Sequence, residues 1–231
     1  MNQAQQDEMK KEAAFKAAQK VVPNSVLGVG TGSTVKFFID ALAEREKKTP
    51  LHLKAIITTS RRSREQLEGY GFHVNELSEV SEIDLTVDGA DRVDAQLNGI
   101  KGGGGALTLE KNVAVNSKRN LWIVDESKVV ARLSGFDLPV EVLPVSCRQV
   151  QDRLEKAGLH PHFRLTAAKK RYVTHYGNYI LDCAVDPIPV PAGLAVYLDQ
   201  CVGVVEHGLF LNICDEVLIA HHDGTIEDRQ R

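Results

Sequence analysis

The protein has 231 residues, of which 43% are hydrophobic and 26% are charged. This composition can supply a sizeable core, in one large domain or in two modest ones. The formal net charge is only −3, and basic residues are interspersed with acidic ones, which argues against an extended nucleic-acid footprint or a basic membrane-surface patch. We therefore expect no nucleic-acid or membrane partner, and we expect any bound anion to be small.

Two further features of the sequence bear on the compartment. No apolar run approaches the roughly 20 residues that span a bilayer, and residues 1–11 are polar, unlike a signal peptide. The four cysteines lie far apart without a C-x-x-C pair, which favours reduced, mostly buried thiols over a zinc ribbon or a dithiol redox centre. They are Cys147, Cys183, Cys201 and Cys214. We expect a cytoplasmic protein.

The N-terminal part of the chain predicts a helix and then a strand, a glycine turn and a second helix. Residues 7–20 have apolar side chains at helical spacing, with Lys10, Lys11 and Lys16 on the wetter side. A buried strand at 26–29 runs into the turn Gly30-Thr31-Gly32-Ser33-Thr34, which opens the second helix. Exposed backbone N–H groups, a helix N-terminus and three hydroxyls suit a phosphate. The alternative is a tight turn capped by Ser33 or Thr34.

This glycine turn matches neither of two well-known nucleotide loops. A P-loop needs a lysine that is absent here, and G-x-G-x-x-G would need glycine where Ser33 or Val35 stands. The next predicted strand, 51–57, opens into Thr58-Thr59-Ser60-Arg61-Arg62. Its basic pair could accommodate the 2′-phosphate of NADP, although an exposed basic helix start is the more common explanation of such a pair.

Strands and helices then alternate, with strands at 72–74, 83–87 and 121–125 and helices at 63–68 and 106–115. This rhythm predicts a doubly wound, mostly parallel sheet of the Rossmann-like class, with ligands at the carboxyl ends of the strands. The Gly30 and Thr58 turns, Asp88 and Asp91 would lie at that edge. Lys128, which follows the last of these strands, is either an anion ligand or an ordinary surface lysine.

The pattern changes near residue 139. We predict strands at 140–144, 163–165, 171–175, 179–182 and 203–206 and helices at 147–157 and 191–200, a split β-α-β-β-α-β order. This predicts an inserted ferredoxin-like α+β subdomain at 137–207, within a Rossmann-like domain formed by 1–136 and 208–231. Residues 212–220 would return to the first sheet, and the tail from His221 would be frayed or docked on the surface.

One stretch gathers three carboxylates and a lysine. Val87-Asp88-Gly89-Ala90-Asp91 is followed by Lys101 in Ile100-Lys101-Gly102-Gly103-Gly104-Gly105, and then by Glu110. Carboxylates that share a site with an ammonium suit acid/base chemistry. The alternative is a flexible glycine loop between solvated charges, although so much glycine costs conformational entropy unless backbone must approach something closely.

Other chemistries have weaker support. His160, His162 and His175 are the nearest approach to a metal cluster, but no suitably spaced carboxylate or cysteine joins them, so we expect no metal site. The G-x-S-x-G elbow of serine hydrolases is missing.

Several of these blocks together resemble the type A ribose-5-phosphate isomerase family, and the resemblance runs nearly end to end. The motifs that show the resemblance are Gly28-Val29-Gly30-Thr31-Gly32-Ser33-Thr34, Val87-Asp88-Gly89-Ala90-Asp91, Lys101-Gly102-Gly103-Gly104, Ala106-Leu107-Thr108 with Glu110-Lys111, Ser127-Lys128 and Leu138-Pro139-Val140-Glu141-Val142. The resemblance implies interconversion of ribose 5-phosphate and ribulose 5-phosphate in the non-oxidative pentose phosphate pathway through an enediolate. It also implies a sugar-phosphate substrate, no metal, no nicotinamide or other cofactor, and a homodimer.

The resemblance also implies residue roles. Glu110 falls on the family's proton-transferring base, Asp88 and Asp91 on its sugar-binding and ring-opening carboxylates, and Lys101 on its substrate-binding lysine. The further residues implied to bind substrate are Lys10, Gly30, Thr31, Gly32, Ser33, Thr34, Gly89, Gly102, Gly103 and Lys128. Arg92 departs from the family, which usually has an acid there, and we expect it to point to solvent. If it faced the cleft instead, it would favour the ionised form of Asp91.

Two other functions stay open from the residues alone. One is an NADP-dependent oxidoreductase using the glycine turn and Arg61-Arg62. The other is a non-catalytic sugar-phosphate sensor, which would need Ser33 and Thr34 but not Glu110 and Lys101 together. Sensors of that kind usually carry a DNA-binding helix-turn-helix, for which we see no room before Val26.

Overall fold

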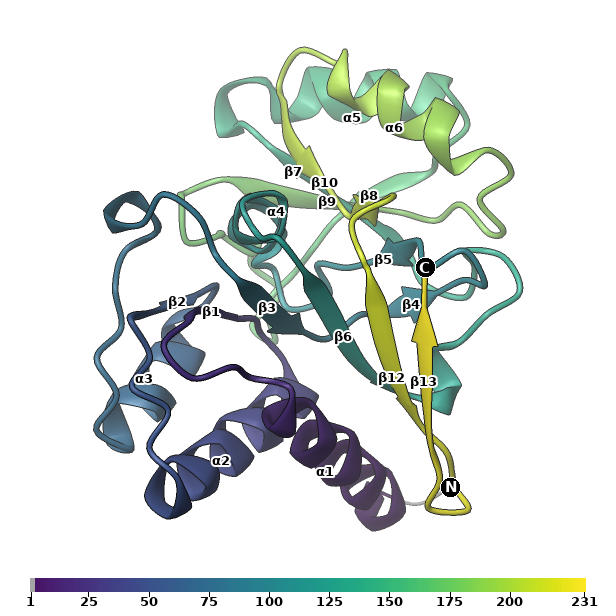
Figure 1. The fold of residues 1–231 in the computed structure, drawn as a ribbon. Helices are drawn as coiled ribbons and strands as arrows, with labels where there is room; N and C mark the ends of the chain where they lie inside the picture. Colours follow the sequence, from purple (N-terminus) through teal and green to yellow (C-terminus); the bar gives the residue numbers. More distant parts are fainter. Residues whose placement is uncertain (1–2) are drawn as a thin grey trace. The chain divides into compact units, whose positions relative to one another are not determined.

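The computed structural model describes residues 3–231, so Met1 and Asn2, the start of the polar N-terminal segment, lie outside the described residues. The chain divides into two compact units, which are described separately below (Figure 1). Unit 1 comprises Met1–Ala90, Leu109–Val129 and Asn212–Arg231, and unit 2 comprises Asp91–Thr108 and Val130–Leu211. Residues 91–108 and 130–136, which the sequence assigned to the Rossmann-like domain, pack with unit 2. The limits of 137 and 207 for the inserted subdomain stay a prediction from the sequence.

Unit 1 is built on a six-stranded sheet in the order β13-β12-β6-β3-β1-β2. Five strands run parallel, and β13 pairs antiparallel with β12. The strands are β1 (Val26–Val29), β2 (Ala55–Thr58), β3 (Leu85–Asp88), β6 (Asn120–Asp125), β12 (Glu216–Ala220) and β13 (Ile226–Gln230). Because helices cover both faces of such a sheet, its inner strands are nearly continuous apolar runs. The expected doubly wound, mostly parallel sheet is confirmed.

The helices of unit 1 pack on the two faces of this sheet. They are α1 (Gln3–Gln19), α2 (Ser33–Lys48), α3 (Arg61–Gly69) and α4 (Leu107–Val115), which begins in unit 2. Leu27 of β1 belongs to the core that α1 and α2 form, whereas the next residue, Gly28, faces Val113 of α4. Adjacent strand residues point to opposite faces, so α4 covers the face opposite α1 and α2.

Three expectations for unit 1 are wrong. Lys10 is buried at 7% exposure, not on the wetter side of α1. Residues 72–74 form no strand, because that segment makes only one parallel bridge, Ile57 to Asn75. The tail after His221 is β13, which pairs with every residue of β12. Its charged side chains are typical of an edge strand that must resist further pairing.

Unit 2 contains a four-stranded antiparallel sheet in the order β10-β7-β9-β8. Its elements are β7 (Leu138–Val142), α5 (Cys147–Lys156), β8 (Pro161–Phe163), β9 (Tyr179–Cys183), α6 (Pro191–Asp199) and β10 (Val204–His207). This is the expected split β-α-β-β-α-β arrangement. The strand expected at 171–175 does not form, because only Arg171 makes a bridge, to Leu165.

A second, three-stranded sheet in unit 2 was not predicted. It has the order β11-β5-β4 and consists of β4 (Arg92–Val93), β5 (Gly99–Ile100) and β11 (Leu209–Phe210). Strands of two residues are too short to show an alternating pattern, so the sequence could not reveal them. This small sheet matters because Asp91 precedes β4 and Lys101 follows β5.

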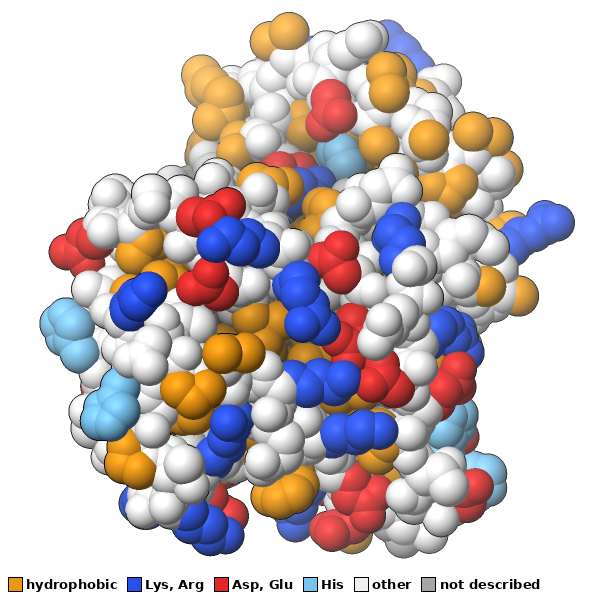
Figure 2. All heavy atoms as spheres, viewed as in Figure 1, with side chains coloured by type: hydrophobic (Ala, Val, Ile, Leu, Met, Phe, Trp, Pro, Cys, Tyr) orange, Lys and Arg blue, Asp and Glu red, His pale blue; other side chains and the backbone are white. Residues whose placement is uncertain are grey.

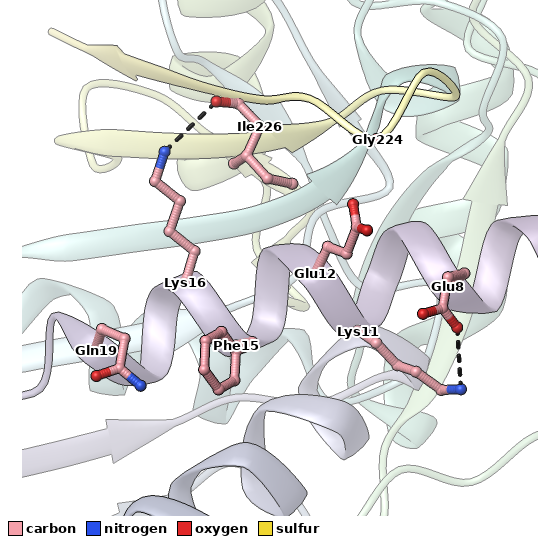
Figure 3. Close-up of a pocket in the computed structure, with 8 residues that line it drawn as sticks. All are labelled: Glu8, Lys11, Glu12, Phe15, Lys16, Gln19, Gly224 and Ile226. Atoms are coloured by element: carbon pink, nitrogen blue, oxygen red, sulfur yellow. Dashed lines mark hydrogen bonds and ion pairs between the residues drawn. The ribbon is translucent and has the colours of Figure 1, made fainter.

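Among residues 3–231, no helix has the length and apolar character needed to cross a membrane. Figure 2 shows acidic and basic side chains interspersed on the visible face, as the near-balanced composition predicts. A hollow of about 530 Å³ lies along α1 of unit 1, and two of its lysines already have partners. Lys11 pairs with Glu8 at 3.2 Å, and Lys16 donates to the carbonyl of Ile226 at 3.4 Å (Figure 3). None of the candidate site residues lines this hollow.

Candidate active site

The turn between β1 and α2 is shaped by close contact with Asp88. A Cβ added at Gly30 would lie 1.9 Å from both Cγ and Oδ1 of Asp88, so only glycine fits there. The N–H groups of Thr31 and Gly89 both donate to Asp88 Oδ1, at 2.9 and 2.7 Å. Asp88 is 3% exposed. The turn therefore holds one buried carboxylate directly beside the start of α2.

Helix α2 begins at Ser33, and Gly32 is its N-cap residue with φ 122°. Neither Ser33 nor Thr34 therefore occupies the capping position. The alternative that one of them caps a tight turn is wrong. The N–H groups of a helix's first turn have no partners within the helix, and they carry the positive end of its dipole. Ser33 is exposed and Thr34 is half-buried, so this helix start can receive a small anion.

The hydroxyl-rich segment after β2 adjoins the same turn. Thr59 is buried, and its hydroxyl lies 2.8 Å from that of Thr31. Ser63 donates to the carbonyl of Gly30 at 2.7 Å. Arg61, by contrast, is exposed and pairs with Glu65 at 2.7 Å, one turn further along α3. An i,i+4 pair on a helix surface is the ordinary role of such an arginine, and nothing here favours an NADP 2′-phosphate site.

Lys10 and Lys128 lie near the carboxyl end of β6. Gln6 of α1 donates to Asp125, the last residue of β6, at 3.3 Å. Lys10 follows Gln6 by four residues and so shares its face of the helix. Lys128 ends the 3₁₀ turn Glu126–Lys128 that follows β6, and it is half-buried. Because β1, β3 and β6 are parallel, these lysines, Asp88 and the Gly30 turn share one edge of the sheet of unit 1.

Glu110 lies in the first turn of α4 and is 4% exposed. The direction of this helix follows from its far end. Ser117, just beyond α4, bonds Thr86 near the amino end of β3, with their hydroxyl oxygens 2.7 Å apart. The C-terminus of α4 therefore lies at the amino ends of the strands, and its first turn lies toward their carboxyl ends. This brings Glu110 to the same edge as Asp88.

In unit 2, Asp91 and Lys101 are held by neighbouring backbone. The N–H of Asp91 donates to the carbonyl of Ile100 at 2.9 Å, which places Asp91 beside the residue before Lys101. Asp91 Oδ2 accepts the N–H of Gly103 at 2.8 Å. Lys101 is 3% exposed, and its Nζ lies 5.3 Å from the centre of the Phe210 ring. The structure thus gathers Asp91, Lys101 and the glycine loop within unit 2.

Three of the four consecutive glycines, Gly102, Gly103 and Gly105, have specific steric roles rather than general flexibility. Gly102 and Gly105 have φ of 104° and 77°, a region that other residues rarely enter. A Cβ at Gly103 would lie 2.8 Å from Asp91 Oδ1, and one at Gly105 would lie 2.5 Å from the hydroxyl of Tyr172. Backbone conformation and the close approach of other groups therefore explain these three glycines, as opposed to a flexible linker.

A buried carboxylate that sequence reasoning did not single out supports the start of α4. Glu141 of β7 is 1% exposed and accepts three hydrogen bonds from neutral donors. The donors are Thr108 at 2.5 Å, Thr174 at 2.8 Å and Asn178 at 2.9 Å. Thr108 stands two residues before Glu110, so Glu141 fixes the first turn of α4. Glu141 lies within the Leu138–Val142 block, but no spacing rule links it to Thr108.

Arg92 was expected to point to solvent, but its side chain is held by backbone carbonyls. Its guanidinium donates to the backbone carbonyls of Asp91 at 2.7 Å, Ser134 at 3.1 Å and Gly135. It also lies 5.7 Å from the centre of the Phe136 ring. The cation therefore ties β4 to the 134–136 segment, and it contacts the backbone of Asp91 rather than its carboxylate.

The three histidines considered as metal ligands have separate partners. His160 lies 3.4 Å from Glu155, His162 lies 3.6 Å from Asp137, and His175 packs edge-on against Tyr176. Over residues 3–231, no group of three or more His, Cys, Asp or Glu side chains is arranged to hold a metal ion. The expected absence of a metal stays a prediction.

Comparison with known proteins relates this chain to one family. The family model described as ribose 5-phosphate isomerase A (phosphoriboisomerase A) matches residues 55–224. A ribose-5-phosphate isomerase A from Lactobacillus johnsonii is 69% identical, covering 100% of both chains. One from Bifidobacterium longum is 47% identical over 97% of this chain and 96% of its own.

Solved structures agree with the sequence matches. Ribose 5-phosphate isomerase A from Neisseria gonorrhoeae superposes with a TM-score of 0.90, at 38% identity and 97% coverage of each chain. A D-ribose-5-phosphate isomerase in complex with phospho-erythronic acid gives a TM-score of 0.92, at 33% identity and 100% coverage of both chains. The match to the Lactobacillus johnsonii protein in sequence and the match to the phospho-erythronic acid complex in structure both span the whole chain. The chain therefore belongs to the ribose 5-phosphate isomerase A family.

Proposed function

We propose that this protein interconverts D-ribose 5-phosphate and D-ribulose 5-phosphate. The observation that carries the proposal is the packing of Gly30 against Asp88, which joins an anion-binding helix start to a buried carboxylate. A phosphorylated sugar that undergoes proton transfer requires both of these functions within one binding site. Membership of the isomerase family supports the same substrate.

The phosphate group would bind at the start of α2. Backbone N–H groups and the hydroxyls of Ser33 and Thr34 would accept it, and Lys10 and Lys128 would neutralise its charge. Both lysines belong to the same sheet edge as the turn, through the contact of Gln6 with Asp125 and the turn after β6. The phosphate is remote from the reacting carbons, so its binding energy would position the open-chain sugar.

Glu110 would move the proton between C1 and C2. This transfer needs one base that can take the proton from one carbon and return it to the next. A carboxylate buried in the first turn of α4 suits that task, because the Thr108–Glu141 contact limits its motion. Lys101 would stabilise the enediolate oxygen, since an ammonium shielded from water interacts strongly with developing negative charge.

Ring opening would fall to the two aspartates. Asp88 and Asp91 stand three residues apart, so their Cα atoms are at most about 11 Å apart by chain length alone. We propose that Asp88 shuttles the hydroxyl proton of the cyclic sugar while Asp91 binds the sugar hydroxyls and orients them for this transfer. Phospho-erythronic acid, found in one related structure, is a phosphorylated sugar acid whose carboxylate resembles the two oxygens of an enediolate. The proposed chemistry uses no metal and no cofactor.

The direct test follows conversion of ribose 5-phosphate to ketose in buffer treated with a chelator, with free ribose as the control substrate. We expect rapid conversion of the phosphate and very slow conversion of ribose. Turnover that requires NADPH or an added divalent metal would refute the proposal, as would equal kcat/KM for the two sugars.

We also propose that the protein works in the cytoplasm as a homodimer within the pentose phosphate pathway. The four free, buried cysteines suit a reducing compartment. Unit 2 exposes the valines Val145, Val196, Val202 and Val205, which burial against a second copy would stabilise. Light scattering of the purified protein at micromolar concentration should give twice the mass of 25.4 kDa. A monomer at that concentration would contradict the dimer.

A further inference from the structure

The glycine loop of unit 2 is held by a largely buried ion pair between Arg164 and Asp182. Arg164 follows β8, and Asp182 belongs to β9. Two guanidinium nitrogens of Arg164 donate to the carboxylate of Asp182, with Nε to Oδ2 at 2.9 Å. Both side chains are largely buried, at 15% and 13% exposure. A forked pair of this kind fixes the guanidinium in one orientation.

The third nitrogen of Arg164 faces the loop. Nη1 donates to the carbonyls of Gly102 at 2.8 Å and Gly103 at 3.0 Å. The carbonyl of Gly102 and the N–H of Gly103 belong to one planar peptide group, in which they point in opposite directions. Holding the carbonyl therefore sets the direction of the N–H. That N–H is the group that donates to Asp91 Oδ2 at 2.8 Å.

The positive charge of Arg164 also acts on this peptide group. Chained hydrogen bonds polarise one another, so a cation at the carbonyl strengthens the N–H as a donor. The carbonyl of Gly102 also accepts the N–H of Gly105 at 2.9 Å, a bond within the loop, so Arg164 is the side chain from outside the loop that holds this carbonyl. Tyr172 closes the other side of the loop, with its hydroxyl 3.5 Å from the carbonyl of Gly104. The loop is thus held at three consecutive peptides, beginning with the one whose N–H contacts Asp91.

We propose that Arg164, anchored by Asp182, is a positioning residue that aligns the carboxylate of Asp91 through the Gly102–Gly103 peptide. This inference rests on the proposed isomerase function, in which Asp91 binds the sugar. The side-chain hydrogen bonds of Arg164 go to Asp182, Gly102 and Gly103, and none goes to Lys101 or to a candidate phosphate ligand. Its loss should therefore act on turnover through Asp91 and leave phosphate binding largely intact.

The test combines Arg164→Met with Asp91→Asn in a double-mutant cycle on ribose 5-phosphate, with rates followed over hours so that slow variants are resolved. We expect Arg164→Met to lower kcat about 10- to 100-fold, the cost of a displacement near 1 Å, with KM within about threefold. In the Asp91→Asn background the same change should lower kcat less than about threefold, because its target has been removed. Arg153→Met is the matched control, since Arg153 donates to the carbonyl of Val202 and does not contact the loop.

Further variants keep the test decisive if Arg164→Met does not fold. Arg164→Lys retains the cation without the fork, and Asp182→Asn removes the anchoring charge; each should lower kcat with the same dependence on Asp91. The inference is overturned if the folded variants keep kcat within threefold of the parent, or if their losses multiply fully with that of Asp91→Asn. An unmodified protein that does not convert ribose 5-phosphate would instead refute the proposed function.

Discussion

Replacement of Gly30 by alanine tests the contact that joins the phosphate turn to Asp88. The added Cβ would lie 1.9 Å from Asp88 Cγ, whereas ordinary van der Waals contact begins at 3.4 Å. Either the turn or Asp88 must therefore move by about 1.5 Å, the difference between those distances. Overpacking of this kind costs about 1–3 kcal/mol of unfolding free energy. A displacement near 1 Å in a catalytic group also costs roughly 100-fold in rate.

We expect Gly30→Ala to unfold at lower urea concentration and to lose roughly 100-fold or more in kcat/KM for ribose 5-phosphate. Gly69→Ala is the matched control, because a Cβ at Gly69 in α3 meets nothing within 4 Å. The control should keep its activity and its stability. If Gly30→Ala folds and keeps kcat/KM within threefold of the parent, then Asp88 is not held against the turn as described, or it has no part in the reaction.

Three further results are expected. Lys128→Ala should raise KM for ribose 5-phosphate about 10- to 100-fold, because a charged hydrogen bond is lost, and this rise should exceed that of Ser33→Ala. The control Lys48→Ala, which changes an exposed lysine, should leave KM unchanged. Equal KM for the parent and Lys128→Ala would show that Lys128 is not part of the phosphate site. Glu141→Gln should cost about 1–3 kcal/mol of unfolding free energy in urea titrations, because an amide cannot accept all three of its hydrogen bonds; unchanged stability would mean that the buried charge is not needed. The hydrogen bond to Glu126 is the main cause that raises the pKa of His221 above its ordinary value of 6.5. The pair therefore stabilises the fold fully below pH 6.5, and this stabilisation is lost as the pH rises through the folded-state pKa of His221. His221→Gln should therefore lose more unfolding free energy at a pH of about 5.5 than at about 9, and an equal loss at both would contradict the pairing.

The sequence predicted the parts of the fold that rest on long apolar segments. Strands β3, β6 and β12 are buried along their whole length, so their position was clear. The two-residue strands of the small sheet in unit 2 were missed, because so short a segment has no periodicity. Strand β13 was missed because its charged residues resemble a loose tail. Its pairing depends on β12, a partner that local pattern does not reveal.

The candidate site shows the same division. Asp88, Asp91, Lys101 and Glu110 could be chosen because carboxylates and a lysine beside glycine turns suggest chemistry. The residues that fix them could not be chosen. Glu141 and Arg164 contact Thr108 and Gly102 from 33 and 62 residues away in sequence. Such contacts arise from the packing of separate strands, and no spacing along the chain encodes them.

The burial of Lys10 illustrates a further limit. Helical periodicity assigned it to the wet face of α1, yet it is 7% exposed. The contact of Gln6 with Asp125 explains the difference, because it holds that face of α1 against the end of β6. A face that packs against a strand end is buried without being apolar. Such a face looks solvent-exposed in sequence, even where it forms part of a candidate binding site.

The most direct test of the proposed mechanism is steady-state turnover of ribose 5-phosphate by Glu110→Gln, with Glu65→Gln as the control. The control changes an exposed glutamate in the same way, on the surface pair with Arg61. If Glu110 transfers the proton, its variant should lose roughly 10²–10⁴-fold in kcat with KM nearly unchanged, while the control matches the parent. A Glu110→Gln variant that turns over within a few-fold of the parent would contradict Glu110 as the base.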